Sequence, residues 1–243
     1  MKIIDIFKLQ NKEKIEIAKE IFKDAYANAN YTLKPSERKK INTYFKRLDK
    51  KEPIEYILKK ANFYGRTFFV NKNVLIPRVE TESIIPYLLK FDSVIDIGTG
   101  SGAVGITIKK ENPDINVLIT DISTKSIYVA KKNAKGMDIK IIHTDLTNKI
   151  PINEYKCIFA NLPYISNMDT LDESVKNYEP FIALYGGLNG IEIILRLIQE
   201  LHTKKWNGTL LLEMDPQQIS LIKENKTIIK DQFGYNRFIQ IDY

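Results

Sequence analysis

Residues 94–106, VIDIGTGSGAVGI, decide the fold, because an apolar run leads here directly into a glycine-rich turn. The run at 93–97 has the length and composition of a buried strand, and residues 102–111 have the pattern of a helix. The turn between them contains Gly98, Gly100 and Gly102. Glycine permits a tight turn and lets a ligand approach the backbone closely. This order predicts a parallel α/β sheet with a ligand site at the turn.

The alternation of short apolar runs and helical patterns continues toward the C-terminus. The predicted strands are 93–97, 116–120, 138–142, 156–160 and 208–213, and the predicted helices are 102–111, 123–134 and 188–203. Parallel strands that are covered on both faces have this appearance. Two last runs, TIIKDQ and NRFIQIDY, leave little room for a helix between them. They therefore predict a terminal antiparallel hairpin added to a mostly parallel sheet.

The region before the sheet has a different pattern. Residues 11–27 space their apolar side chains as a helix does, a second helix starts after Pro35, and a short third helix has Pro53 as its first residue. Two β-rich runs around Gly65 then indicate a hairpin. We therefore predict a small helical domain at 1–60, a β-hairpin linker at 61–76 and the α/β domain at 77–243.

Composition indicates an ordinary globular protein, but its charge is unevenly distributed. The 243 residues are 44% hydrophobic and 28% charged, and the net charge is +7. Residues 1–80 hold 19 Lys and Arg against 10 Asp and Glu, a net of +9, whereas the remainder holds 18 against 20, a net of −2. The basic N-terminal third could contact RNA or the ribosome, or it could be a solvated helical surface rich in lysine.

The single cysteine, Cys157, excludes a disulfide framework and favours a reducing compartment. Its position inside an apolar run predicts a core residue. No apolar run reaches about 18 residues, so we expect no membrane span. His143 and His202 are interpreted as structural or surface residues. We expect a cytoplasmic monomer that has no membrane contact and needs no metal.

The spacing of glycines and acids bears on the cofactor. Asp121 ends the second strand, 23 residues after Gly98, where a carboxylate can accept hydrogen bonds from ribose hydroxyls. The spacing is G-x-G-x-G rather than the dinucleotide G-x-G-x-x-G, and Asp96 lies beside the turn. A carboxylate there suits a cationic ligand better than a diphosphate, which favours S-adenosylmethionine over NAD. A glycine-rich turn that binds no cofactor is the remaining alternative. Asp145 either brackets the adenine, with Leu146 as an apolar edge, or is a loop residue.

The segment Asn161-Leu162-Pro163-Tyr164 follows the fourth strand, at the sheet edge where ligands bind. The Asn161 side-chain oxygen and the Leu162 backbone carbonyl can accept both hydrogens of a planar NH2 group. Pro163 stiffens the turn, and Tyr164 can cover the planar group. Positioning of the nitrogen against a sulfonium methyl would supply much of the rate gain, and no strong base is needed. Taken alone, the four residues could equally be a strand-ending turn.

Several segments together resemble the N5-glutamine methyltransferases that modify the Gly-Gly-Gln loop of peptide chain release factors. NVLIPRVETE (73–82) is similar to the family's vLIPRpETE, VIDIGTGSGAVGI (94–106) to its cofactor motif, and ANLPYI (160–165) to its sNPPYI. YEPFIALYGGLNGIEIILRLI (178–198) and GTLLLEMDPQQ (208–218) resemble its yEPxxALxgGxdGlxxxxxii and GxxxxEhgxxQ. The likeness extends over most of the chain from about residue 53, in one unbroken order.

The resemblance implies a helical domain that binds the release factor, a hairpin linker and a class I S-adenosylmethionine-dependent methyltransferase domain. It implies that the cofactor is held by Gly98, Thr99, Gly100, Ser101, Gly102, Asp121, Asp145, Leu146 and Asn161. It assigns the glutamine side chain to Asn161, Leu162, Pro163 and Tyr164, and places Arg78 with Glu80 or Glu82 at the mouth of the site. The PRVETE segment could equally be a helix N-terminus with a capping role.

The chain departs from the family pattern in four places. Leu162 and Val79 stand where the family usually has proline, the chain ends soon after IQIDY, and YILKKANFYG lacks the usual glycine after YI. The position of Leu162 acts through its backbone carbonyl, so leucine can serve there in a looser turn.

Other functions share parts of this pattern. Ribosomal RNA adenine dimethyltransferases also have NLPY, but their extra domain follows the catalytic one. DNA adenine methylation and ribosomal-protein glutamine methylation are further alternatives. A non-catalytic release-factor or RNA adaptor that kept the fold is an alternative of another class.

Overall fold

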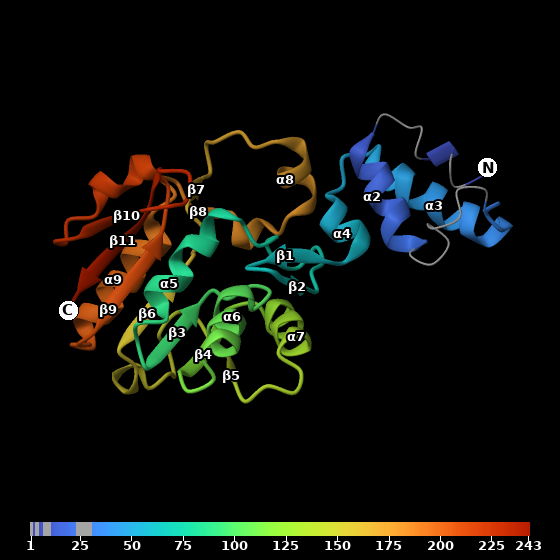
Figure 1. Ribbon diagram of the computed structural model, residues 1–243. Helices are drawn as coiled ribbons and strands as arrows, with labels where there is room; N and C mark the ends of the chain where they lie inside the picture. The colour runs from blue at the N-terminus through green and yellow to red at the C-terminus, as the bar shows by residue number, and fades with distance from the viewer. Residues whose placement is uncertain (1, 3–4, 7–10, 23–30) are drawn as a thin grey trace. The chain divides into compact units, whose positions relative to one another are not determined.

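The computed structural model describes residue 2 and residues 5–6, 11–22 and 31–243, and the chain divides into two compact units (Figure 1). The first unit comprises Met1–Lys60 and Leu171–Tyr178, and the second comprises Ala61–Thr170 and Glu179–Tyr243.

Among the described residues of the first unit, three helices share one apolar core and a fourth, short helix lies beside them. They are α2 (Lys12–Ile21), α3 (Pro35–Leu48), α4 (Ile54–Leu58) and α8 (Glu173–Tyr178). Ile17, Ile41 and Ile57, from the first three, are all at most 1% exposed and belong to one cluster. The end of the predicted first helix, residues 23–27, lies outside the described residues. Pro53 is the N-cap of α4 rather than its first residue, because its ψ of 137° is extended.

The short helix α8 joins this unit although more than 100 residues separate it from α3 and α4. Tyr178 Oη donates a hydrogen bond to the Lys50 carbonyl oxygen at 2.8 Å, and Lys51 Nζ lies 2.7 Å from Glu173 Oε2. Inside the same unit Lys14 pairs with Asp49, and Arg47 pairs with Glu52. Part of the positive charge of the N-terminal third is therefore balanced internally.

A seven-stranded sheet forms the centre of the second unit, in the order β10-β11-β9-β6-β3-β4-β5 (Figure 1). Its strands are β3 (Ser93–Ile97), β4 (Asn116–Asp121), β5 (Lys140–His143), β6 (Cys157–Ala160), β9 (Thr209–Glu213), β10 (Thr227–Lys230) and β11 (Asn236–Asp242). The five strands from β9 to β5 are parallel, whereas β11 pairs antiparallel with β9 and with β10. The predicted mostly parallel sheet with a terminal hairpin is confirmed.

Helices cover both faces of the sheet, which explains why its central strands are apolar without interruption. On β3 the alternate residues Ile95 and Ile97 face one core with α9 (Glu192–Thr203), whereas Val94 faces the other. The second core also contains residues of α5 (Ile85–Leu88), α6 (Ala103–Glu111) and α7 (Thr124–Asn133). Cys157 is fully buried, as predicted for a core residue.

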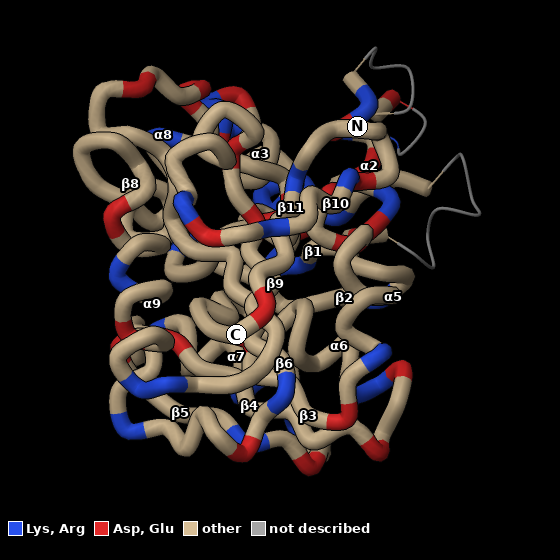
Figure 2. The backbone as a smooth tube through the Cα atoms, turned by 90° about the vertical axis from the view of Figure 1, so that its left-hand side faces the viewer, with Lys and Arg blue, Asp and Glu red and all other residues tan. Residues whose placement is uncertain are grey.

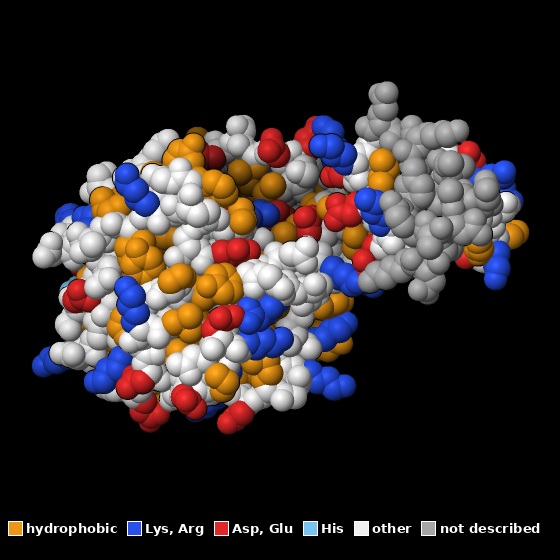
Figure 3. All heavy atoms as spheres, viewed as in Figure 1, with side chains coloured by type: hydrophobic (Ala, Val, Ile, Leu, Met, Phe, Trp, Pro, Cys, Tyr) orange, Lys and Arg blue, Asp and Glu red, His pale blue; other side chains and the backbone are white. Residues whose placement is uncertain are grey.

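Charged residues lie mainly in the peripheral loops and helices (Figure 2), and on the face seen in Figure 3 basic side chains are interspersed with acidic and apolar ones. Asp96, Asp121 and Glu213 are exceptions, since they lie on central strands and are at most 8% exposed. Within the described residues, no helix is long and apolar enough to span a membrane.

The hairpin of β1 (Ala61–Phe63) and β2 (Arg66–Phe68) turns at Tyr64 and Gly65 and belongs to the second unit. Phe63 and Phe68 are buried in the core that also contains α6, and their rings meet edge-to-face at 6.2 Å. A 3₁₀ turn, η1 (Glu80–Ile84), then leads into α5. Aromatic burial therefore holds the hairpin against the sheet domain.

Some elements differ from the sequence-based prediction. The predicted helix 188–203 starts only at Glu192, because β8 (Tyr185–Gly187) and a turn at Gly190, with a φ of 76°, precede it. β8 pairs with the two-residue strand β7 (Ile165–Ser166), and β5 starts later than predicted. Short 3₁₀ segments complete the unit: η2 (Ile152–Glu154), η3 (Phe181–Ala183) and η4 (Pro216–Leu221).

Candidate functional site

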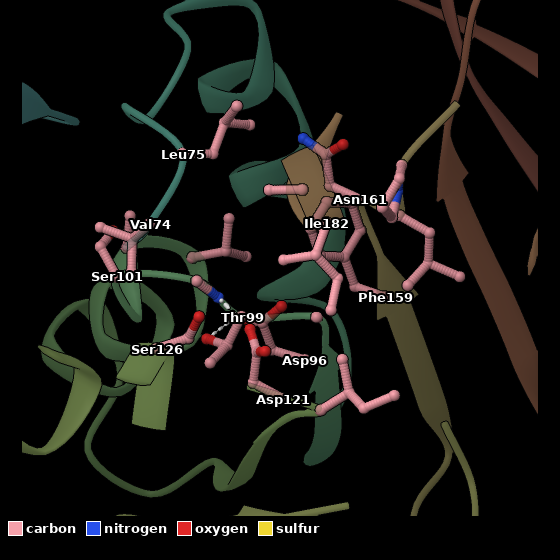
Figure 4. Close-up of a pocket in the computed structure, with 18 of the residues that line it drawn as sticks. Val74, Leu75, Asp96, Thr99, Ser101, Asp121, Ser126, Phe159, Asn161 and Ile182 are labelled. Carbon is pink, nitrogen blue, oxygen red and sulfur yellow. Dashed lines mark hydrogen bonds between the residues drawn. The ribbon is translucent and has the colours of Figure 1, made fainter. Parts of the chain in front are cut away.

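A pocket opens at the carboxyl ends of the parallel strands, inside the second unit. Figure 4 shows Asn161 at one end of it, Asp121 and Ser126 at the other, and Val74 and Leu75 along one side. The predicted site residues that line it are Arg78, Gly98, Thr99, Gly100, Ser101, Asp121, Asp145, Leu146, Asn161, Leu162 and Pro163. Gly102, Tyr164, Glu80 and Glu82 do not line it. The structure thus brings the glycine turn and the Asn161 turn together although some 60 residues separate them.

The glycine turn is shaped by backbone conformations that other residues rarely adopt. Gly98 has a φ of 73°, and a Cβ there would lie 3.1 Å from the Leu162 side chain. Gly102 has a φ of 84°, and a Cβ there would lie 2.7 Å from Ile106. Gly102 is therefore needed to start α6 close to its neighbours, and it acts on the pocket only through the shape of the turn.

Two buried acids face the pocket beside this turn. Asp96 Oδ2 accepts hydrogen bonds from Thr99 Oγ1 at 2.7 Å and from the Gly105 N–H at 3.0 Å, and burial raises the pKa of Asp96 to about 6. Asp121 Oδ2 accepts from the Gly100 N–H at 2.9 Å, and burial likewise raises the pKa of Asp121. Both carboxylates have spare lone pairs, so they can accept ligand hydroxyls or stabilise a ligand cation.

The far wall combines apolar residues with an ion pair. Asp145 pairs with Arg196 of α9, and both side chains line the pocket together with Ile122. Leu146 is 5% exposed and has a φ of 43°, a left-handed conformation that is costly for leucine. This wall offers a flat aromatic ring apolar contact on its surface and polar groups at its edge.

The turn at Asn161 directs polar groups into the pocket. Asn161 Nδ2 lies 3.5 Å from Thr81 Oγ1, which contacts Glu213 in turn. Leu162 is 5% exposed, so the side chain that replaces proline is packed in the core. Tyr164 is part-buried beside the pocket, and burial raises its pKa to about 12, so the phenol is neutral at physiological pH.

Residues from two later segments support this turn from behind. A Cβ on Gly186 would lie 2.2 Å from the Pro163 carbonyl oxygen, and one on Gly190 would lie 2.3 Å from the Tyr164 carbonyl oxygen. Gln218 Nε2 donates a hydrogen bond to that same Tyr164 oxygen at 2.7 Å. The backbone of the turn is therefore fixed by direct contact with YGGLNG and with the final glutamine of EMDPQQ.

The polar residues of the PRVETE segment have different roles. Arg78 lines the pocket and pairs at 2.7 Å with Glu179, whose side chain is 2% exposed. Glu82 Oε1 accepts the Tyr64 N–H at 2.8 Å, so it fastens the β1–β2 hairpin. The 3₁₀ turn does start at Glu80, but neither acid of the segment forms a side-chain cap for it.

Sequence reasoning missed three polar residues around the Asn161 turn. They are Thr81, Glu213 and Gln218, of which the first two are at most 4% exposed. All three lie inside segments that resemble the glutamine methyltransferase family, so those segments were the available signal. Their contacts span up to 132 residues of sequence, and neither periodicity nor spacing reveals such contacts.

Comparison with known proteins gives one family match and a set of similar sequences. Residues 72–178 match the family described as methyltransferase small domain. The chain is 32% identical to the release factor glutamine methyltransferase of Flavobacterium psychrophilum over 83% of this chain and 79% of that one. It is 36% identical to the release factor glutamine methyltransferase of Staphylococcus aureus, over 79% and 76%.

Among solved structures, the hMettl16 catalytic domain in complex with an RNA hairpin has a TM-score of 0.54 with this chain. The match covers 95% of this chain and 90% of that one, at 17% identity. At that identity the likeness supports the methyltransferase fold and carries no argument about substrate.

Proposed function

The chain belongs to the release factor glutamine methyltransferases, and from this premise we propose that it transfers a methyl group from S-adenosylmethionine to the side-chain amide nitrogen of the Gly-Gly-Gln glutamine of peptide chain release factors. The observation that carries the proposal is one pocket lined both by the glycine turn and by Asn161, Leu162 and Pro163. This shared lining supports a cofactor site beside an acceptor for a planar NH2 group.

The chemistry of the pocket fits this cofactor. The buried carboxylates Asp96 and Asp121 favour a ligand with cationic and hydroxyl groups, and the apolar wall around Leu146 suits an adenine ring. Of the two arginines that line the pocket, Arg78 is paired with Glu179 and Arg196 with Asp145, so neither presents an unbalanced charge. When bound, the cofactor supplies an electrophilic methyl group.

The protein's own residues then hold the acceptor. The Asn161 side-chain oxygen and the Leu162 carbonyl oxygen accept the two N–H groups of the glutamine amide and hold its nitrogen in line with the methyl group. The methylated nitrogen would carry one proton more than the neutral amide product, and this proton would pass to water. Both acceptors stabilise the positive charge that develops on the nitrogen, so the rate gain comes from positioning and electrostatics.

The test is methyl transfer from labelled S-adenosylmethionine to a purified release factor, with 16S-type ribosomal RNA as the competing substrate, followed by mass mapping. We expect one methyl group on the motif glutamine and none on a release factor whose glutamine is replaced by glutamate. Label on RNA would overturn the proposal in favour of adenine methylation. Absence of binding heat with S-adenosylmethionine would favour a non-catalytic adaptor.

Asn161→Ala tests the assignment of the turn to the substrate. We expect it to abolish transfer while calorimetric affinity for S-adenosylmethionine stays nearly unchanged, because the cofactor relies mainly on the glycine turn and Asp121. Asn207→Ala, an exposed amide outside the pocket, is the matched control and should retain full activity. Equal loss of transfer and cofactor binding in Asn161→Ala would contradict the assignment.

The proposal extends to the helical unit and to the partners. We assign recognition of the release factor to the helices of residues 1–60, with RNA or ribosome contact through their basic side chains, and a monomeric, cytoplasmic enzyme that uses no metal. Removal of residues 1–60 should then raise the KM for the release factor while the affinity for S-adenosylmethionine is retained. Light scattering of the full chain tests the monomer.

A further inference from the structure

A buried carboxylate lies close to the turn at Asn161 and takes no part in the methyl transfer itself. Glu213 ends β9 and is 1% exposed. Its Oε2 accepts a hydrogen bond from Thr81 Oγ1 at 2.6 Å, and Thr81 itself is 4% exposed. Thr81 Oγ1 in turn lies 3.5 Å from Asn161 Nδ2. Three separate segments of the chain therefore meet in one row that ends at the pocket.

The row has a direction, because a hydroxyl has only one proton. Thr81 donates that proton to the Glu213 carboxylate, so toward Asn161 its oxygen can only accept. An accepting oxygen selects the NH2 end of the Asn161 amide. The Asn161 side chain also lowers the pKa of Glu213, as a donor to an ionised carboxylate does. Both partners thus favour Nδ2 on the inner side, which leaves Oδ1 for the pocket.

This preference matters because an amide is nearly symmetrical in shape. Exchanging its oxygen and its NH2 group changes the volume very little but turns an acceptor into a donor. A glutamine amide nitrogen presents two donors, so a reversed Asn161 would meet it with a third donor and no acceptor. A group that biases this choice therefore acts directly on productive binding.

We propose that Glu213 and Thr81 are positioning residues that hold the Asn161 amide with its oxygen toward the substrate nitrogen. The inference rests on the proposed function, since it concerns how the same turn accepts a glutamine amide. Neither residue touches the reacting atoms; both act through Asn161.

The charge state of Glu213 determines the direction of the hydrogen bonds that join Glu213, Thr81 and Asn161. Arg237 on β11 and Glu80 on η1 face it, and Tyr164 lies beside it. Burial raises the pKa of Glu213 to about 7, while Thr81, Arg237 and Asn161 oppose the rise. Once protonated, Glu213 can donate to Thr81, which frees the Thr81 proton for Asn161 Oδ1 and removes the bias. Activity should therefore fall with acid.

Substitutions at Thr81 test the direction of the row. Thr81→Val keeps the shape but removes the hydroxyl, and we expect kcat for release factor methylation to fall about tenfold or more. Thr81→Ser restores the hydroxyl and should stay within about threefold of the parent. Calorimetric affinity for S-adenosylmethionine should be unchanged in both. Thr107→Val is the matched control, because Thr107 is fully buried with an unpartnered hydroxyl and lies outside the pocket.

The pH profile gives a readout that a purely structural role would not move. At saturating substrates, kcat of the parent at pH 6 should be about a tenth of that at pH 8, following the ionised fraction of a group with a pKa of about 7. Glu213→Gln should be slower and lose most of this slope. Asp96 titrates near pH 6 in both proteins, so the comparison isolates Glu213.

The outcomes are separable. Three results would overturn the inference while the parent still methylates the release factor. They are a parent-like kcat in Thr81→Val, a kcat in Thr81→Ser as low as that in Thr81→Val, and an unchanged pH dependence of kcat in Glu213→Gln. If the parent itself leaves the glutamine unmodified, the proposed function fails first.

Discussion

Replacing Glu213 by glutamine is expected to stabilise the protein at alkaline pH even though it slows the reaction. Burial raises the pKa of Glu213 from 4.5 to about 7, so the folded state holds a proton there that the unfolded state has lost. Stability from this group is fully present below pH 4.5 and is lost as pH rises through 7. This difference in pKa means that ionising Glu213 above pH 7 costs the folded state about 3 kcal/mol.

Glutamine has the same shape and never ionises, so it avoids this cost. We expect Glu213→Gln to unfold near the parent temperature at pH 4.5 but about 6 to 12 °C higher at pH 8, measured by circular dichroism. Glu173→Gln is the opposite control, because Lys51 lowers the pKa of Glu173 and its removal brings no gain. The same difference from the parent at both pH values, or a loss of stability at pH 8, would refute the reasoning.

Two further substitutions test the supports of the pocket. Asp121→Asn should weaken S-adenosylmethionine binding at least tenfold by calorimetry, because a ligand hydroxyl loses a charged acceptor; unchanged affinity would remove Asp121 from the ribose site. Gly190→Ala should lower the free energy of unfolding by at least about 2 kcal/mol more than Gly136→Ala, as measured in urea, and should reduce kcat as well. Both glycines have a φ near 80°, but only a Cβ on Gly190 would collide, at 2.3 Å from Tyr164; equal losses would mean that crowding behind the turn is unimportant.

The sheet was predictable because its signal is local. Strands β3, β4, β6 and β9 are apolar on both faces, and the glycines between β3 and α6 mark a turn that few other residues can form. The weak elements were missed for the opposite reason. β7 has two residues and β8 has three, so neither is long enough to show an alternating pattern of apolar and polar residues. The turn at Gly190 delays the start of the helix, although the apolar residues around it fit a helical pattern. Such short strands are determined by the partner they meet.

The candidate site likewise contains some residues that the sequence predicts and others that it does not. The predicted ligand-binding residues that line the pocket come from turns with recognisable composition, so Gly98, Asp121 and Asn161 could be selected from the sequence. No turn of recognisable composition distinguishes Thr81 and Glu213 in the sequence. A threonine and a glutamate are ordinary in any segment, and their relation depends on 132 residues of intervening chain. Only the folded chain places the Thr81 hydroxyl between Glu213 and an amide 80 residues further on.

The leucine at position 162 shows where the stiffness of this turn comes from. A proline there would limit the turn through its own ring, whereas leucine leaves the backbone of Asn161 and Leu162 freer. In this chain the limit comes from outside: the buried Leu162 side chain packs against Gly98, and Gln218 holds the Tyr164 carbonyl. Glycine at 98 is therefore required both for its φ and for the space that Leu162 occupies. The glycine turn and the turn at Asn161 are thus one packed unit, and a change in either is transmitted to the other.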